Sequence, residues 1–135
     1  MNTGLVFGVF DGLHEGHRAM LEQARFRVDR LVVALPSDRA VEGLKSKIPS
    51  QLWEVRSQAL RDSGLVDDVV LGDETLGEYH ILDVVQPDVV LLGYDQRDLK
   101  KDLERFCHDR PSSPHIVSLE PFEPERYKSS LLNTV

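Results

Sequence analysis

This sequence has little cysteine, no long apolar run and no recognisable pattern of a signal peptide. Its one cysteine, Cys107, excludes a disulfide within the chain and reads as a structural helix residue. No apolar run approaches the ~20 residues of a transmembrane helix. Residues 1–4 also lack the basic start of a signal peptide. A lone thiol suits a reducing compartment, so we expect a cytoplasmic protein with no membrane partner.

Positive charge is also scarce, because 16 lysines and arginines face 23 acidic residues and give a net charge of −7. Nucleic acids and anionic membranes need a positive field, so neither is an expected partner. A small nucleotide needs only local cations. The candidates for this role are Lys45, Lys47, Arg56, Arg97, Arg126 and Lys128.

The 135 residues, of which 41% are apolar, suit one domain over residues 1–135 with one core. Short apolar runs predict strands at 5–10, 31–35, 69–71, 89–92 and 116–119. Helices are expected at 17–27, 51–62, 79–85 and 99–108, and a last one near Ser130. Ser50 is the expected N-cap of helix 51–62, and the polar, lysine-bearing stretch 40–50 predicts a mobile loop.

Uniformly apolar strands that alternate with helices indicate a parallel sheet covered on both faces. Ligands of such sheets bind beyond the carboxyl ends of the strands. The segment Gly8 to His17, GVFDGLHEGH, occupies such a place between the first strand and the first helix. A helix N-terminus attracts anions, Gly16 allows close approach, and His14 and His17 can donate to phosphate oxygens. The alternative is a pair of ordinary surface histidines.

The residues His14-Glu15-Gly16-His17 resemble the His-x-Gly-His signature of the cytidylyltransferase-like nucleotidylyltransferases. The resemblance implies an α/β fold, a Rossmann-like three-layer sandwich with a five-stranded parallel sheet in a single domain. Gly93-Tyr94-Asp95-Gln96 is similar to a segment of small archaeal-type FAD synthetases and their glycerol-phosphate cytidylyltransferase relatives. A tight turn capped by Asp95 is the plainer interpretation of that segment.

Two further segments extend the resemblance. In the family, a loop lysine and a helix arginine approach the phosphates, which points to Lys47, with Lys45 as its alternative, and to Arg56. Tyr127-Lys128-Ser129-Ser130 resembles the start of the family's last helix, where hydroxyl and backbone N–H groups bind phosphates. The glycerol-phosphate branch carries a longer motif there, which this chain lacks.

The resemblance thus implies a set of site residues. Catalytic roles fall to His14, His17, Lys47 and Arg56. Nucleotide contacts fall to Gly8, Val9, Phe10, Asp11, Gly16, Gly93, Tyr94, Asp95, Gln96, Lys128, Ser129 and Ser130. Asp11 is the single candidate for a metal contact, through water.

The implied reaction moves a nucleoside monophosphate from CTP or ATP, with Mg²⁺, to a phosphorylated acceptor and releases pyrophosphate. An ionised phosphomonoester needs no general base, so positioning and electrostatic stabilisation do the work. The acceptor is either a small alcohol phosphate such as glycerol 3-phosphate, or FMN. The resemblance of the segments 93–96 and 127–130 favours FMN. A flavin needs an apolar wall, for which Phe10, Tyr94, Phe122 and Tyr127 are candidates. A nucleotide-binding module without turnover is the alternative of another class, and a homodimer is expected from the resemblance.

Overall fold

A five-stranded, fully parallel sheet forms the centre of the protein. The computed structural model describes residues 2–74 and 77–120. Its strands, paired in the order β3-β2-β1-β4-β5, are β1 (Thr3–Phe7), β2 (Arg30–Leu35), β3 (Asp68–Leu71), β4 (Val89–Leu92) and β5 (His115–Ser118). The expected fold class is therefore confirmed.

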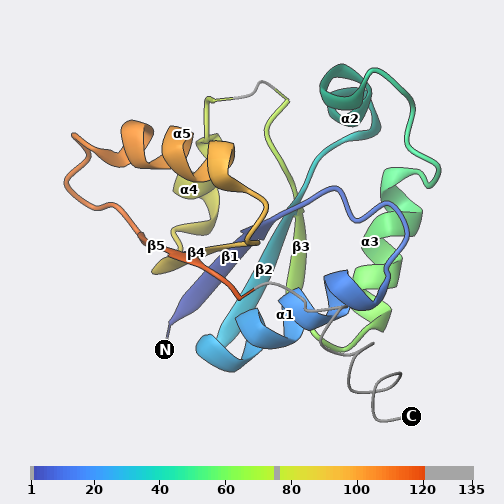
Figure 1. Cartoon of the computed structure of the whole chain (residues 1–135), viewed down its shortest axis with the longest axis horizontal. Coiled ribbons are helices and arrows are strands. Elements are labelled where there is room, and N and C mark those ends of the chain that lie inside the picture. The colour runs from blue at the N-terminus through green and yellow to red at the C-terminus, as the bar shows by residue number, and fades with distance from the viewer. Residues whose placement is uncertain (1, 75–76, 121–135) are drawn as a thin grey trace, which may run out of the picture.

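Helices cover both faces of this sheet (Figure 1). They are α1 (Glu15–Arg27), α2 (Asp38–Lys45), α3 (Trp53–Asp62), α4 (His80–Val85) and α5 (Arg97–Cys107). Apolar residues of α1 and α3 join one buried cluster, and those of α4 and α5 join another. Within the described residues, no helix is long and apolar enough to cross a membrane.

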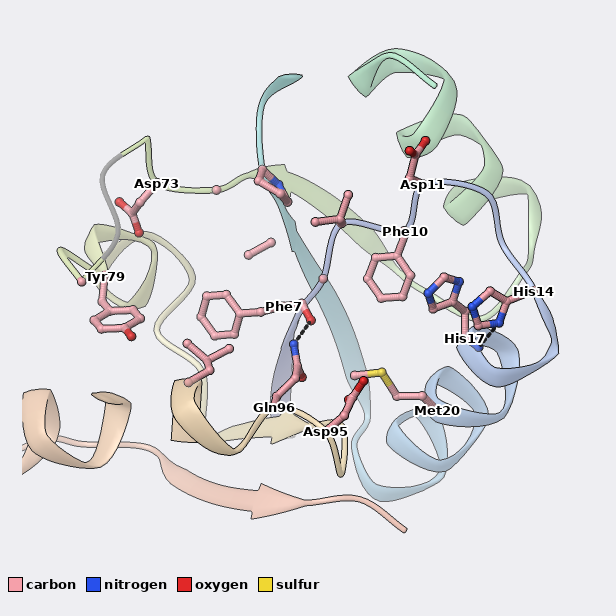
Figure 2. A pocket seen from close by; sticks show the side chains of 17 residues that line it. Phe7, Phe10, Asp11, His14, His17, Met20, Asp73, Tyr79, Asp95 and Gln96 are labelled. Atoms are coloured by element: carbon pink, nitrogen blue, oxygen red, sulfur yellow. Dashed lines mark hydrogen bonds between the residues drawn. The ribbon is translucent and has the colours of Figure 1, made fainter. Parts of the chain in front are cut away.

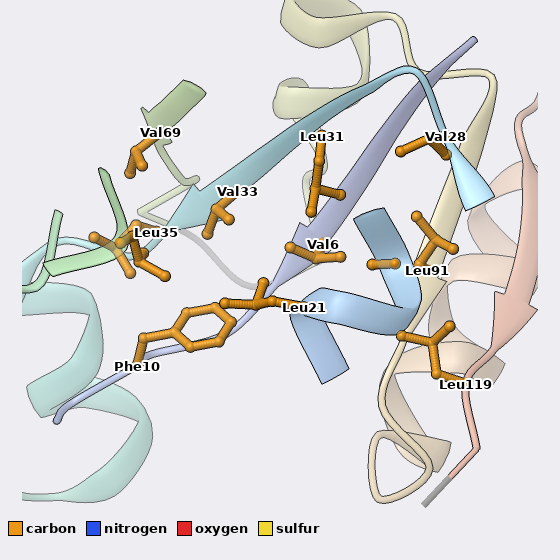
Figure 3. Packing of buried hydrophobic residues seen from close by; sticks show 12 residues of the cluster. Val6, Phe10, Leu21, Val28, Leu31, Val33, Leu35, Val69, Leu91 and Leu119 are labelled. Atoms are coloured by element: carbon orange, nitrogen blue, oxygen red, sulfur yellow. The ribbon is translucent and has the colours of Figure 1, made fainter. Parts of the chain in front are cut away.

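The alternation of side chains along each strand explains the uniformly apolar strand sequences. Val6 points into the α1–α3 cluster, whereas its neighbour Leu5 points into the α4–α5 cluster. Figure 3 shows Val6 packed among Leu21 of α1, Leu31 and Leu91. Two covered faces leave the carboxyl ends of the strands as the open edge, where α1 begins after β1.

The predicted strand 5–10 is correct only in its first part, because pairing ends at Phe7. Phe10 adopts a positive φ of 50°, which no strand permits. Its side chain is nevertheless buried in the α1–α3 cluster. The chain therefore turns away from the sheet after Phe7 and places the segment before α1 over the strand ends.

The prediction of a loop over 40–50 is wrong in its first half, where α2 lies. The Ser37 hydroxyl caps this helix by accepting from the Ala40 N–H at 3.0 Å, and Val41 is buried. The polar composition that suggested a loop belongs to the exposed side of a short helix. The remaining loop ends at α3, which begins at Trp53 rather than at residue 51.

Ser50 is not the N-cap of α3. Leu52 holds that position and makes no side-chain cap bond. The backbone N–H of Ser50 donates instead to a carboxylate oxygen of Asp11 at 2.8 Å. Ser130, near which a last helix was expected, lies outside the described residues, as do Lys128 and Ser129.

Candidate functional site

A cavity of about 610 Å³ opens at the carboxyl edge of the sheet (Figure 2). Its volume is typical of small-molecule sites. It brings together eight of the residues that the sequence singled out: Gly8, Val9, Phe10, Asp11, His14, His17, Asp95 and Gln96. The segment between β1 and α1 and the segment after β4 thus meet at one site, as the parallel topology requires.

His14 is the N-cap of α1, and this role determines which ring nitrogen can donate a hydrogen bond. Its Nδ1 accepts from the backbone N–H of Gly16 at 3.0 Å and of His17 at 3.3 Å. A nitrogen that accepts hydrogen bonds carries no proton, so the neutral ring bears its hydrogen on Nε2. The cap therefore presents His14 to a ligand as an Nε2–H donor. It also occupies two helix N–H groups that were expected to face phosphate.

His17 is held by rings on two sides. The His14 and His17 rings stack with centroids 3.7 Å apart and planes inclined by 17°. The buried ring of Phe10 packs edge-on against His17 at 5.1 Å. Three aromatic rings from two adjoining segments thus form a preordered wall at this end of the cavity.

The packing of Phe10 also explains why position 8 is glycine. A Cβ added to Gly8 would lie 2.6 Å from the Phe10 ring, closer than real contacts allow. Gly8 therefore makes room for an aromatic side chain. The sequence had assigned this glycine to nucleotide contact, and it does line the cavity.

The segment after β4 is tied to β1 by the side chain of Gln96. Its Oε1 accepts from the Gly93 N–H at 2.8 Å. Its Nε2 donates to the Phe7 carbonyl at 3.0 Å, and this bond is drawn in Figure 2. Gln96 holds two neighbouring strand ends together and lines the cavity beside Asp95. Asp95 is exposed and does not cap α5, whose N-cap is Gln96. Gly93 and Tyr94 do not belong to the cavity lining, and Tyr94 is exposed.

Asp11 anchors the loop before α3. Its two carboxylate oxygens accept the N–H groups of Ser50 and Gln51, each at 2.8 Å. The hydrogen bond from Ser50 is the main cause that lowers the pKa of Asp11 below its usual value. Asp11 thus remains ionised on the cavity rim while it fixes the course of residues 50–51.

Arg56 has a different position from the one expected. It is fully buried and does not line the cavity. Its guanidinium donates to three carbonyls and one carboxylate, namely those of Val9 (3.0 Å), Pro36 (3.0 Å), Gln51 (3.0 Å) and Asp38 (2.8 Å). These contacts join the segments after β1 and β2 to the start of α3. Arg56 supports the cavity from behind and is not a phosphate contact here.

Lys47 lies in the loop after α2, where it is exposed. It does not belong to the cavity lining, but its charge helps to lower the pKa of Asp11. The loop lysine is therefore near the rim of the site rather than inside it.

Several lining residues were not singled out by the sequence, and on the other flank they include Asp73, Tyr79 and Leu99. Asp73 caps α4, because its carboxylate accepts the N–H groups of His80 at 3.1 Å and Ile81 at 3.2 Å. Tyr79 is buried and donates to Asp102. Burial, aided by Asp102, raises the pKa of Tyr79, which stays protonated. The position of Asp73, two residues after the end of the third strand, is the sequence signal that could have identified it as a site residue.

Comparison with known proteins shows the family of this chain. Residues 5–132 match the family model described as cytidylyltransferase-like. The chain belongs to the cytidylyltransferase-like family. Two curated relatives named FAD synthase support this membership. That of Aciduliprofundum boonei is 37% identical over 115 residues, 85% of this chain and 76% of the relative. That of Methanosarcina barkeri is 35% identical over 119 residues, 88% of this chain and 84% of the relative.

A solved structure shows the same architecture. The lipopolysaccharide core biosynthesis protein of Thermoplasma volcanium superposes with a TM-score of 0.81 at 29% identity, covering 90% of this chain and 98% of that one. This cytidylyltransferase-like chain is therefore a nucleotidyltransferase, and the expectation of such an enzyme from the histidine motif is confirmed.

Carboxylates around the cavity bear on metal binding by this cytidylyltransferase-like enzyme. Within residues 2–74 and 77–120, no three His, Cys, Asp or Glu side chains gather closely enough to hold an ion alone. Mg²⁺ needs no such cage, because it usually binds substrate phosphates, waters and one or two carboxylates. Asp11, ionised on the rim with one lone pair left on each oxygen, fits that role.

Proposed function

We propose that this enzyme transfers AMP from ATP to FMN and so forms FAD and pyrophosphate. The observation that carries the proposal is the likeness, over most of both chains, to relatives named FAD synthase. The cavity supports it, because a histidine pair stands at one end and apolar side chains continue beyond it. A small alcohol phosphate would leave that apolar part unused.

In this reaction, a phosphate oxygen of FMN attacks the α-phosphorus of ATP in line. A new P–O bond forms as the bond from the α-phosphorus to the bridging oxygen breaks, and pyrophosphate leaves with the electron pair. The attacking oxygen is already ionised, so no base has to remove a proton. The enzyme must position the two phosphates and stabilise the charge that develops on the α-phosphate and the leaving group.

His14 and His17 provide this stabilisation in our proposal. The cap on Nδ1 leaves Nε2–H of His14 as the donor, with no rotation needed to present it. His17, stacked on His14 and braced by Phe10, is the second phosphate contact. A preorganised donor is effective because it does not have to reorient when charge develops on the phosphate.

Other residues approach the phosphates from the rim. Lys47 and the Lys128–Ser130 segment are proposed contacts on the leaving-group side, and Asp95 and Gln96 on the nucleoside side. Asp11 is the residue we assign to Mg²⁺, through water. The ion, when bound, neutralises phosphate charge.

The test crosses ATP and CTP against FMN and glycerol 3-phosphate, with Mg²⁺ and pyrophosphate release as the readout. The proposal predicts release with ATP plus FMN and at most traces in the other three reactions. Release with CTP plus glycerol 3-phosphate would replace it by a cytidylyl transfer. Nucleotide binding without release from any pair would favour a binding module.

A further inference from the structure

The cavity crosses the carboxyl edge of the sheet and has two ends of different chemistry. The histidine end contains His14 and His17, and its apolar neighbours Phe10 and Met20 pack with the α1–α3 cluster. The tyrosine end is defined here by Phe7, Ala34, Pro36, Asp73, Tyr79 and Leu99. Of these, Phe7, Ala34, Tyr79 and Leu99 pack with the α4–α5 cluster. In Figure 2, Tyr79 and Asp73 lie across the cavity from His14 and His17, and Phe7 lies between them.

Charge keeps a polyphosphate away from the tyrosine end. The side chains that line the cavity, as far as the chain is described, include no lysine or arginine. The acidic group of the tyrosine end is Asp73, and the exposed His80, 3.7 Å from it, is not part of the lining. A triphosphate would meet a carboxylate and apolar walls there, so it belongs with the imidazole donors.

The walls of the tyrosine end are apolar and firmly held. Tyr79 is only 4% exposed, and its hydroxyl donates to Asp102 from the adjoining helix α5. Phe7 meets it edge-on, with ring centroids 6.4 Å apart. Leu99, Ala34 and Pro36 add aliphatic surface. Rigid aromatic and aliphatic walls suit a flat, uncharged ring system, which stacks at little entropic cost.

Strand order indicates which substrate carries that ring. The histidine turn follows β1 at the centre of the sheet, with β4 on one flank and β2 and β3 on the other. The nucleoside contacts that we propose, Asp95 and Gln96, follow β4. The tyrosine end takes Ala34, Pro36 and Asp73 from β2 and the segments after β2 and β3, and Leu99 of α5 borders it from the β4 side. In-line transfer at the centre places nucleoside and acceptor on opposite flanks.

We infer that the tyrosine end binds the planar, uncharged heteroaromatic ring of the acceptor, with Asp73 accepting a hydrogen bond from a ring N–H group. The inference rests on the proposed function and assigns the flavin ring of FMN to this end. Asp73 caps α4 with one lone pair of each oxygen, so a second remains on each for such a donor.

Riboflavin tests this subsite alone, because it carries the ring without the phosphate that the transfer reaction needs. Its affinity for the full chain is measured by the change in flavin fluorescence, and the affinity for ATP by calorimetry. Leu99→Phe fills the tyrosine end and should weaken riboflavin binding by about tenfold or more, and Leu99→Ala, which removes wall surface, by about threefold. Leu71→Phe adds the same atoms at a position 55% exposed outside this cavity and is the matched control.

The inference holds when both Leu99 variants weaken riboflavin binding, while Leu71→Phe does not and ATP affinity stays within about twofold throughout. It is overturned if Leu99→Phe weakens ATP binding instead, since the base would then occupy this end. Absent riboflavin binding, or an unchanged KM for FMN in Leu99→Phe, also overturns it. The proposed function fails separately, if the wild type binds riboflavin at Leu99 yet makes no FAD from ATP and FMN.

Discussion

At the scale of single residues, we assign two tasks to one histidine, and a substitution can separate them. His14 accepts two backbone N–H groups as the N-cap of α1, and its remaining nitrogen is the proposed phosphate donor. His17 is not the N-cap of α1, and its ring packs against the His14 and Phe10 rings. We therefore expect the loss of each histidine to affect stability differently, although either loss should slow the reaction strongly.

Replacing His17 by alanine should lower kcat by about 10²–10³, because one preorganised donor to the developing charge is lost. His108→Ala, on a side chain 82% exposed, is the control and should leave kcat unchanged. Steady-state pyrophosphate release measures both variants. Wild-type turnover in His17→Ala would exclude the proposed role.

Replacing His14 by alanine should cost about 0.5–2 kcal/mol of unfolding free energy, the usual value of a lost N-cap. His14→Asn should recover most of that stability, because asparagine is a good N-cap. Neither variant should recover turnover, since the Nε2–H donor is gone. Urea unfolding and kcat are measured on both, and an active His14→Asn enzyme would show that the residue serves only as a cap.

At the scale of elements, the cavity depends on Arg56, a buried cation that does not line it but binds residues that do. Arg56 of α3 binds the carbonyls of Val9 and Pro36 and the carboxylate of Asp38. It thereby fixes the segments that follow β1 and β2 relative to α3. A buried guanidinium in a set of satisfied hydrogen bonds is costly to remove, because its partners stay buried and unpaired.

Arg56→Met should therefore lower the free energy of unfolding by about 2–4 kcal/mol. Arg56→Lys should not restore it, since one ammonium group cannot replace a planar fork of donors. Arg39→Met, at an exposed position of α2, is the matched control and should change stability by less than about 0.5 kcal/mol. Denaturant titrations decide the matter, and a stable Arg56→Met variant would mean that this network is not structural.

Features that depend on local sequence could be predicted, whereas contacts between distant segments could not. The carboxyl-edge site and the His14–His17 turn followed from apolar runs and one motif, because both depend on local sequence. Arg56 was expected at the phosphates, but its partners are three carbonyls and a carboxylate from distant segments, which no local pattern shows. The α2 helix was missed because its polar exposed side resembles a loop.

At the scale of the whole molecule, carboxylates that bind backbone N–H groups connect the sheet to its loops. Asp11 holds residues 50 and 51, and Asp67 accepts the N–H of Leu31 in β2 as well as Arg25 of α1. Burial alone would raise the pKa of Asp67, but these two donors outweigh it and lower the pKa. Both carboxyl groups are therefore more acidic in the folded chain than in the unfolded chain.

This difference predicts acid destabilisation. Because the folded pKa values lie below the ordinary 3.8, the two groups contribute stability above that pH and lose it as pH falls through the lowered values. The unfolding free energy should fall in that acidic range, and less steeply in Asp67→Asn than in the wild type or in Asp109→Asn, whose side chain is 96% exposed. Urea unfolding at a series of pH values measures this, and equal slopes in all three proteins would contradict it.

Transfer of a labelled phosphate shows whether the histidine cavity joins a nucleotide to a flavin phosphate. The full chain is incubated with Mg²⁺, FMN and ATP labelled at its α-phosphate, and the products are separated. We expect the wild type to place the label in FAD, and His17→Ala to do so at a rate lower by about 10²–10³. Unlabelled flavin with the wild type, or equal labelling by both proteins, would contradict it.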